Sequence, residues 1–259
     1  MKKIFHTVTM AAVLTAAASC EHKDLCYDHS HTVDVKVAFD WKNAPGAAPA
    51  SMSFYLFPTG GGEALRYDFT DCTGGTIRVP VGNYEALCLN SDTENINYRN
   101  TECRETFEVT TRAADLLSGL SVLGVLSDGV PRVDGTEDER VILPPDMLWS
   151  DCVESIELKR TDGTTTVTLR PEMSVCRYSV EIRNAANLKY VSGISGSLSS
   201  MAESLYPGVG CDATCKMGAT IPFDAAVSAD KSTVTGGLFA FGCPSARKTH
   251  TLTVYAVLS

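Results

Sequence analysis

Short segments in which apolar and polar residues alternate recur through most of this sequence. The clearest runs over residues 32–41, where Val33, Val35, Val37 and Phe39 share one side of an extended chain. A period of two is the pattern of a β-strand with one buried face. Further segments of this kind, separated by Gly, Pro, Asn or Asp, cover residues 53–57, 65–69, 76–79, 84–89, 106–110, 155–159, 164–169, 176–183, 233–241 and 250–258. This arrangement predicts an all-β fold made of antiparallel sandwiches.

A charged stretch at residues 132–145, which ends in two prolines, divides the pattern into halves. Such composition is typical of a linker. We therefore expect two antiparallel β-sandwich domains in tandem, at residues 32–140 and 145–259. The apolar segment at 250–258 meets the end of the chain with no following turn, which suggests a truncated C-terminal sandwich.

Two local pairings are also expected. Asp162-Gly163 stands between the segments at 155–159 and 164–169. Because Asp-Gly readily adopts positive φ, this spacing predicts a β-hairpin. The last two segments, 233–241 and 250–258, are expected to form a closing pair.

The N-terminus has the features of an export signal. Lys2 and Lys3 precede an apolar run at residues 8–18, which is too short to span a bilayer as a helix. Ala17-Ala18-Ser19 before Cys20 resembles the lipobox of bacterial lipoproteins, although Ala17 stands where Leu is commonest. The resemblance implies cleavage of residues 1–19 and lipidation of Cys20. An ordinary secretory signal that happens to precede a cysteine is the alternative.

Lipidation would decide where the protein resides. One acyl chain anchors a protein marginally, whereas two or more, such as palmitate chains, hold it stably. We expect an outer-membrane protein attached through Cys20, with residues 20–31 as a tether. The charged residues Glu21, Lys23 and Asp24 fit either display on the cell surface or a plain solvated tether, which leaves the periplasmic face open.

Composition argues against other classes of protein. The formal net charge of −9 disfavours binding to nucleic acid, which requires clustered Lys and Arg. The longest apolar stretch after the leader, residues 116–126, is too short to cross a membrane and contains two glycines and two serines. We expect it to be buried within a domain.

The chain contains ten cysteines, so lipidation of Cys20 leaves an odd number for internal pairing. Cys88 and Cys176 lie in apolar strand segments and are expected to be small buried residues. Cys211 and Cys215 are the best local pair, as a disulfide or as two free thiols. No histidine cluster accompanies them in the sequence, so a zinc site is not expected.

No spacing typical of an active site occurs. His29 and His31 lie in the tether and are expected to be solvated. The acidic run Glu137-Asp138-Glu139 is a solvated linker in the simplest interpretation, with calcium binding as the alternative. We therefore expect no catalytic residues, no cofactor and no metal, and a protein that is not an enzyme.

Several stretches resemble a family of Bacteroidota lipoproteins designated domain of unknown function 5119. The stretches are Cys20-Glu21-His22-Lys23-Asp24-Leu25-Cys26, Phe39-Asp40-Trp41, Ser53-Phe54-Tyr55-Leu56-Phe57-Pro58, Val79-Pro80-Val81-Gly82-Asn83-Tyr84, Asn90-Ser91-Asp92-Thr93-Glu94-Asn95 and Met147-Leu148-Trp149-Ser150. The resemblance covers essentially the whole chain. The family is in turn similar to the fimbrillin-like proteins, whose anchor and tip subunits are lipoproteins with two transthyretin-like β-sandwiches.

The resemblance implies a structural or adhesive role as an anchor or accessory subunit of a fimbria. Such subunits associate when one chain donates a β-strand to another, so that main-chain hydrogen bonds supply the affinity. In fimbrillins an Arg-specific cut can release an N-terminal strand, and Arg112 or Arg132 would be the candidates for such a cut.

A glycan-binding surface lipoprotein is the alternative function. Sandwich domains that bind carbohydrate usually expose aromatic side chains on one face or loop. Trp41, Trp149, Tyr98 and Tyr206 are the candidates. Trp41 is in phase with the apolar side of its strand, which favours a place in the core.

Overall fold

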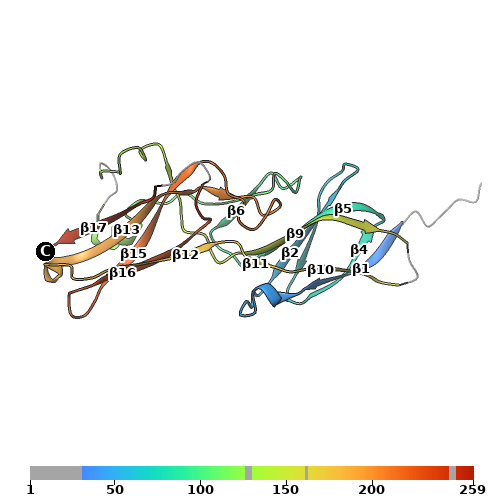
Figure 1. The fold of residues 1–259 in the computed structure, drawn as a ribbon, viewed down its shortest axis with the longest axis horizontal. Coiled ribbons are helices and arrows are strands. Elements are labelled where there is room, and N and C mark those ends of the chain that lie inside the picture. Colours follow the sequence, from blue (N-terminus) through green and yellow to red (C-terminus); the bar gives the residue numbers. More distant parts are fainter. Residues whose placement is uncertain (1–30, 126–129, 161–162, 245–248) are drawn as a thin grey trace, which may run out of the picture.

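The computed structural model describes residues 31–125, 130–160, 163–244 and 249–259. Within these residues the chain forms strands and three short 3-10 helices, with no α-helix. Figure 1 shows an elongated molecule in which β1 begins near one end and β17 ends at the other. The prediction of an all-β fold is confirmed.

The N-terminal lobe is a sandwich of a three-stranded sheet, in the order β10-β1-β4, and a five-stranded sheet, in the order β11-β9-β5-β2-β3. Its strands are β1 (Thr32–Phe39), β2 (Met52–Pro58), β3 (Leu65–Phe69), β4 (Gly74–Pro80), β5 (Gly82–Asn90), β9 (Trp149–Leu158), β10 (Thr165–Leu169) and β11 (Glu172–Met173), and the 3-10 helix η1 spans Trp41–Asn43. The alternating residues Val33, Val35, Val37 and Phe39 all point into the core between the sheets.

The C-terminal lobe is built on a six-stranded sheet, in which β12-β16-β15-β13-β17 form the main path and β8 pairs with β15. A three-stranded sheet, in the order β14-β7-β6, lies between this sheet and the N-terminal lobe. The elements are β6 (Ile96–Arg99), β7 (Glu108–Thr111), η2 (Ser118–Leu123), β8 (Arg140–Val141), β12 (Cys176–Ile182), η3 (Leu188–Tyr190), β13 (Val191–Ala202), β14 (Ser204–Leu205), β15 (Gly218–Val227), β16 (Val234–Ala240) and β17 (Thr251–Leu258).

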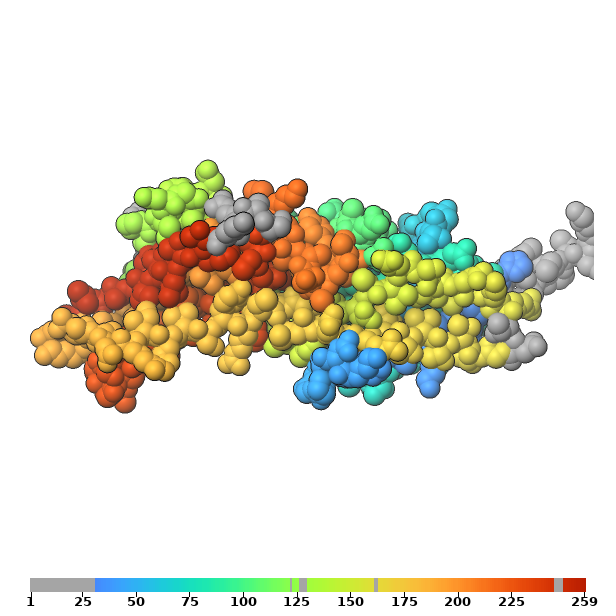
Figure 2. Space-filling view, in the orientation of Figure 1, coloured from blue at the N-terminus to red at the C-terminus, as the bar shows by residue number. Residues whose placement is uncertain are grey.

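The sheet pairing corrects the predicted boundary between residues 32–140 and 145–259. Strand β9 pairs with β5, and β10 pairs with β1, so strands from both sides of the boundary share sheets. In Figure 2 the yellow atoms of this returning segment lie among the blue and cyan atoms of the N-terminal strands. Before it returns, the chain passes through β6, β7 and β8 in the C-terminal lobe.

The stretch at 132–145 is not a solvated linker, because parts of it are built into the C-terminal lobe. The Glu139 carboxylate is buried and accepts hydrogen bonds from the backbone N–H and hydroxyl of Ser200 and from the Thr220 hydroxyl. Val141 pairs with Thr220 in β15. The charged residues of this stretch predicted exposure to solvent. The Glu139 carboxylate is buried instead, because hydrogen bonds inside the protein replace those it would form with water.

Both predicted local pairings are wrong. Strands β9 and β10 lie in different sheets and do not form a hairpin around Asp162-Gly163, which lies partly outside the described residues. Strand β16 pairs with β12 and β15, whereas β17 pairs with β13. Two pairings, β1 with β10 and β8 with β15, are parallel, so the sheets are not purely antiparallel.

Strands β2 and β5 are buried on both faces and contribute alternate residues to two separate apolar cores, which joins the two lobes. Phe54 and Cys88 point into the core of the N-terminal sandwich. Tyr55 and Leu87, one residue away in each strand, point into a second core that also contains Phe107 of the β6–β7 connection. The rings of Tyr55 and Phe107 pack edge to face with centroids 4.9 Å apart.

A buried arginine links the lobes at the same junction. The Arg104 guanidinium forms an ion pair with Glu85 of β5, with Nε and Oε2 3.2 Å apart, and donates a hydrogen bond to the Gly208 carbonyl. Gly208 also approaches the Arg104 backbone so closely that an added Cβ would collide with its carbonyl. The junction is therefore fixed by charge and close packing as well as by apolar burial.

We predict that a fragment of residues 32–140 does not fold by itself. It lacks Ile156, Leu158, Val167 and Leu169, which belong to the N-terminal core. Each fully buried aliphatic side chain contributes about 1.5–3 kcal/mol, and total stabilities are only about 5–15 kcal/mol. The fragment should give a collapsed amide NMR spectrum, whereas residues 31–259 should give a dispersed one. A cooperative thermal transition of the fragment would contradict the interleaved topology.

Candidate interaction surface

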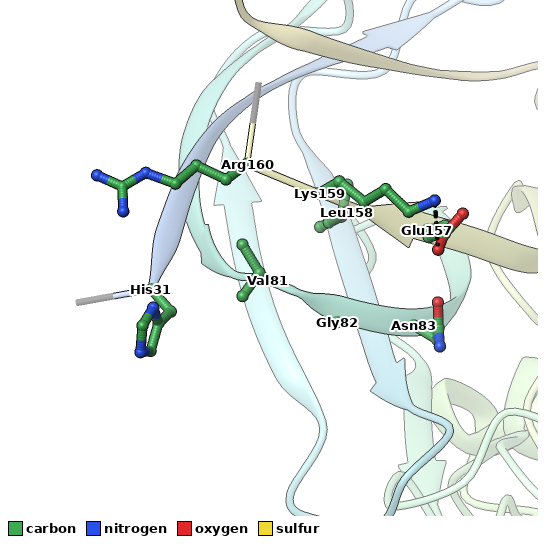
Figure 3. Close-up of a pocket in the computed structure, with 8 residues that line it drawn as sticks. All are labelled: His31, Val81, Gly82, Asn83, Glu157, Leu158, Lys159 and Arg160. Atoms are coloured by element: carbon green, nitrogen blue, oxygen red, sulfur yellow. Dashed lines mark ion pairs between the residues drawn. The ribbon is translucent and has the colours of Figure 1, made fainter. Parts of the chain in front are cut away.

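The predicted lipid-attachment residue Cys20 and the tether up to residue 30 lie outside the described residues. The chain enters the described fold at His31, whose carbonyl accepts a hydrogen bond from the Val81 backbone N–H at 2.6 Å. An open hollow of about 370 Å³ lies here, and Figure 3 shows the side chains around it. It is lined by His31, Val81, Gly82, Asn83, Glu157, Leu158, Lys159 and Arg160. Among the described residues that line it, the imidazole is the one aromatic side chain, so these residues provide no flat platform for stacking a sugar.

The two tryptophans pack against each other. Their ring centroids are 6.2 Å apart with an interplanar angle of 89°, and the Trp41 indole N–H donates to the Cys72 carbonyl at 2.7 Å. Trp41 packs against the N-terminal core, as its strand phase predicted. Because both rings contribute to internal packing, they do not form an exposed binding platform.

The two candidate tyrosines are partly buried at other places. Tyr98 packs against Phe107 with centroids 5.6 Å apart, and burial raises the pKa of Tyr98 to about 12. Tyr206 is half-buried, and its backbone N–H donates to the Ala213 carbonyl. The structure therefore does not gather the four aromatic candidates on one exposed face.

The described cysteines range from fully buried to exposed. Cys88 is fully buried, as predicted, whereas Cys176 is exposed because β12 is the outermost strand of its sheet. Cys211 and Cys215 are both free thiols. Among the residues that the structure describes, no group of three or more His, Cys, Asp or Glu side chains is arranged to hold a metal ion.

The two candidate cleavage sites differ in accessibility. Arg112 is exposed and donates hydrogen bonds to the Glu94 carbonyl and the Asn95 side chain. Arg132 is half-buried and held by the Glu137 carbonyl and the Thr220 hydroxyl. Of the two, only Arg112 lies exposed to a protease without rearrangement of the lobe.

The feature that sequence reasoning missed is an apolar face on the six-stranded sheet. Register places Leu252 of β17 beside Leu198 of β13, which lies beside Ile221 of β15. On the far strands, Tyr178 of β12 lies beside Leu238 of β16. We define the apolar face as the residues on this side of the sheet, namely Tyr178, Val180, Ile182, Ile194, Leu198, Ile221, Phe223, Val234, Leu238, Leu252, Val254 and Leu258.

The apolar face is only partly covered. Its centre is closed, with Ile221 at 0% and Phe223 at 6% exposure, but Leu252, Val254 and Leu258 of β17 are 40%, 38% and 72% exposed. The Phe223 ring lies against Gly196 and Gly236 of the neighbouring strands, where added Cβ atoms would collide with it. Large apolar residues that stay exposed together typically mark a surface for a partner.

The opposite side of the same sheet is polar, and along β13 it is nevertheless covered. Ser195, Ser197 and Ser199 of β13 are buried, although Ile194 and Leu198 on the apolar side are only half-buried. The helix η2 packs on this polar side, with Gly119 against Ser195 and Asp224. A one-sided sheet usually covers its apolar side and leaves its polar side in water. This sheet does the reverse along β13 and β17.

Strand β17 also has one unpaired edge within the described residues. Its hydrogen bonds run to β13, and it is the last strand on that side of the sheet. Alternate backbone N–H and C=O groups along its outer edge are therefore available to a further strand. The apolar face and this edge adjoin each other at the end of the molecule that lies opposite β1 (Figure 1).

Comparison with known proteins places the chain in a family. A family model described as a domain of unknown function (DUF5119) matches residues 19–224. The chain belongs to this family. It is 23% identical over 204 residues to a Bacteroides ovatus protein provisionally named fimbrium anchoring subunit Fim4B. The match covers 78% of this chain and 56% of that protein, so the chain spans little more than half the length of this curated relative.

Solved structures share the fold. A provisionally assigned adhesin from Bacteroides ovatus superposes with a TM-score of 0.67 at 22% identity, over 93% of this chain and 83% of the adhesin. The fimbrial anchor protein Mfa2 from Porphyromonas gingivalis superposes with a TM-score of 0.52 at 17% identity, over 86% of this chain and 77% of Mfa2. At these identities the similarity shows a common architecture.

We predict that Tyr98 makes stability fall at alkaline pH. The pKa is raised from 10.0 to about 12 by burial, so the folded state holds the phenolic proton more tightly than the unfolded state. The stabilisation is present below pH 10 and is lost as pH rises through 12. Urea unfolding measures the free energy of unfolding at pH 8 and at pH 11.5. Between these values wild type should lose on the order of 1–2 kcal/mol more than Tyr98→Phe does. Tyr190→Phe, at an exposed tyrosine, is the control and should behave like wild type. An equal loss of unfolding free energy in Tyr98→Phe and wild type would refute the assignment to Tyr98.

Proposed function

We propose that this protein is a lipid-anchored structural component of a surface fimbria, in which the apolar face binds another fimbrial subunit. The observation that carries the proposal is the exposure of Leu252, Val254 and Leu258 on the apolar side of β17, although the polar side of the neighbouring strand β13 is covered by η2. The names of the relatives, a fimbrium anchoring subunit and a fimbrial anchor protein, support the same role.

The placement of the two ends supports an anchoring function. The tether joins the fold at β1, and the apolar face lies at the opposite end of the elongated body (Figure 1). A protein held through Cys20 would therefore present this face away from the membrane. In the described residues no helix has both the length and the apolarity needed to traverse a bilayer. We assign the attachment to acyl chains on Cys20 and place the protein at the outer membrane, facing the cell exterior.

The proposed partner segment is an apolar β-strand supplied by another subunit. A strand that adds to the free edge of β17 would gain main-chain hydrogen bonds, and its alternate side chains would extend the apolar face beside those of β17. The exposed row of Leu252, Val254 and Leu258 on β17 would then favour apolar residues at every second position of the added strand. We propose this binding as the basis of a structural role without catalysis.

The alternative of glycan binding has less support from the described residues. Trp41, Trp149 and Tyr98 are engaged in internal packing, and the hollow beside His31 lacks a stacking platform. We therefore do not propose a carbohydrate site on these residues.

Replacement of the lipidated sulfur should release the protein from the envelope. Because a serine hydroxyl cannot form the thioether, Cys20→Ser should leave the protein without acyl chains. The variant should then move from the detergent-rich to the aqueous phase in a phase-partition assay of washed envelopes. Cys26→Ser, which changes the next cysteine of the tether, should partition like wild type. Retention of Cys20→Ser in the detergent-rich phase would disprove lipid anchoring at this residue.

A lysine at the centre of the exposed row should abolish subunit binding without unfolding the protein. Val254 is already 38% exposed, so Val254→Lys should cost about 1 kcal/mol or less in stability. In the parent bacterium it should eliminate co-purification of fimbrial subunits, identified by mass spectrometry. Thr253→Lys, on the other side of β17, is the matched control and should preserve co-purification. Equal recovery of subunits with both variants would rule out the apolar face as the binding site.

A further inference from the structure

Two exposed thiols, Cys176 and Cys243, line one small cleft in the C-terminal lobe. The Tyr178 hydroxyl oxygen lies 3.8 Å from the Cys243 Sγ. Cys176 precedes Tyr178 by two residues on the same side of β12, and it lines the same cleft as Cys243. Both residues are exposed, so an oxidant in solution can reach them.

The backbone around the two residues holds this arrangement in place. Cys176 begins β12 and pairs with Ala240 at the end of β16, three residues before Cys243. Gly242 has a φ of +114°, which takes the chain out of the strand between them, and a Cβ at Gly242 would lie 3.9 Å from the Cys176 Sγ. The Cys243 carbonyl accepts a hydrogen bond from the Thr214 hydroxyl at 3.0 Å. A disulfide requires two such adjacent and well-held backbones.

A third thiol lies in the same small cleft and has a different environment. The cleft has a volume of about 190 Å³ and contains Cys176, Cys211 and Cys243. The Cys211 thiol donates a hydrogen bond to the Glu172 carboxylate at 3.0 Å. Burial and this carboxylate raise the pKa of Cys211 to about 12, which keeps it a thiol. Since thiolates are the attacking species in disulfide exchange, Cys211 is a poor participant.

We propose that Cys176 and Cys243 form a disulfide in the exported protein, which ties the start of β12 to the segment that follows β16. One thiolate attacks the disulfide of an exported thiol–disulfide oxidoreductase, which forms a mixed disulfide and releases one thiolate of the oxidant. The second cysteine, as a thiolate, then displaces the oxidant's other sulfur. In total the protein loses two protons and two electrons, and the oxidant is reduced to a dithiol. Export provides the oxidising compartment in which such bonds persist.

The bond would stabilise β12, an edge strand of the sheet that carries the apolar face. Among the strands that the structure describes, β12 is the outermost on its side and pairs with β16 alone. A bond between residues 176 and 243 closes a loop that includes β13, β15 and β16. A cross-link over so long a loop restricts the unfolded chain strongly and should stabilise the lobe.

The direct test is a peptide map of the full chain isolated from envelopes after its free thiols are blocked with an alkylating agent. Trypsin cuts after Arg160 and Arg177 and after Lys231 and Arg247, so each of the two resulting peptides contains one cysteine. We expect these peptides to be joined before reduction and separate after it. A map with both cysteines alkylated, or with Cys211 joined to either of them, would overturn the proposal.

Variants give an independent readout on the same full chain. In an oxidised glutathione buffer, wild type and the exposed-cysteine control Cys103→Ser should each lose a pair of thiols and gain on the order of 5–10 °C in Tm. Cys176→Ser and Cys243→Ser should show neither change. Unchanged oxidation in either of these variants would exclude the assigned pair, whatever the effect on stability.

Discussion

The burial of β2 and β5 on both faces is the constraint on which the rest of the structure depends. One face of these strands closes the N-terminal sandwich, and the other packs against Phe107 and the strands β6 and β7. A strand that is buried twice needs partners from both lobes. The chain satisfies this need by leaving the first sandwich after β5 and returning to it with β9 and β10. The Arg104–Glu85 ion pair strengthens the same junction.

This constraint explains what sequence reasoning could and could not predict. Alternation in residues 32–41 identified β1 and its buried residues, because a strand's own periodicity is local information. The partners of β9 and β10 were missed because Asp162-Gly163 favours a local hairpin, whereas burial of Leu158 and Leu169 requires different sheets. The predictions for Glu139 and Cys176 were wrong for a related reason. Residue type alone does not show that the fold buries the Glu139 carboxylate or that Cys176 lies on an exposed edge strand.

The candidate surface was even less accessible to prediction. Residues 250–258 read as a well-formed strand, and the structure confirms a strand there, but alternation does not show which face the rest of the protein covers. The coverage depends on η2, which packs on the serine side of β13 and leaves the apolar side of β17 open. The predicted anchoring residue presents the opposite case. Cys20 is proposed from a local motif alone, and the described part of the fold adds only the position at which its tether joins β1.

The shared architecture of the relatives and the reversed coverage along β13 and β17 together lead to one account, in which an anchored body offers its apolar face to a second subunit. Site-specific photo-crosslinking on intact cells of the parent bacterium tests it most directly. A photoreactive amino acid in place of Leu252 should form an adduct with a fimbrial subunit, whereas one in place of Thr235, on the other side of the sheet, should not. Adducts from Leu252 that lie only within its own polypeptide would contradict the account.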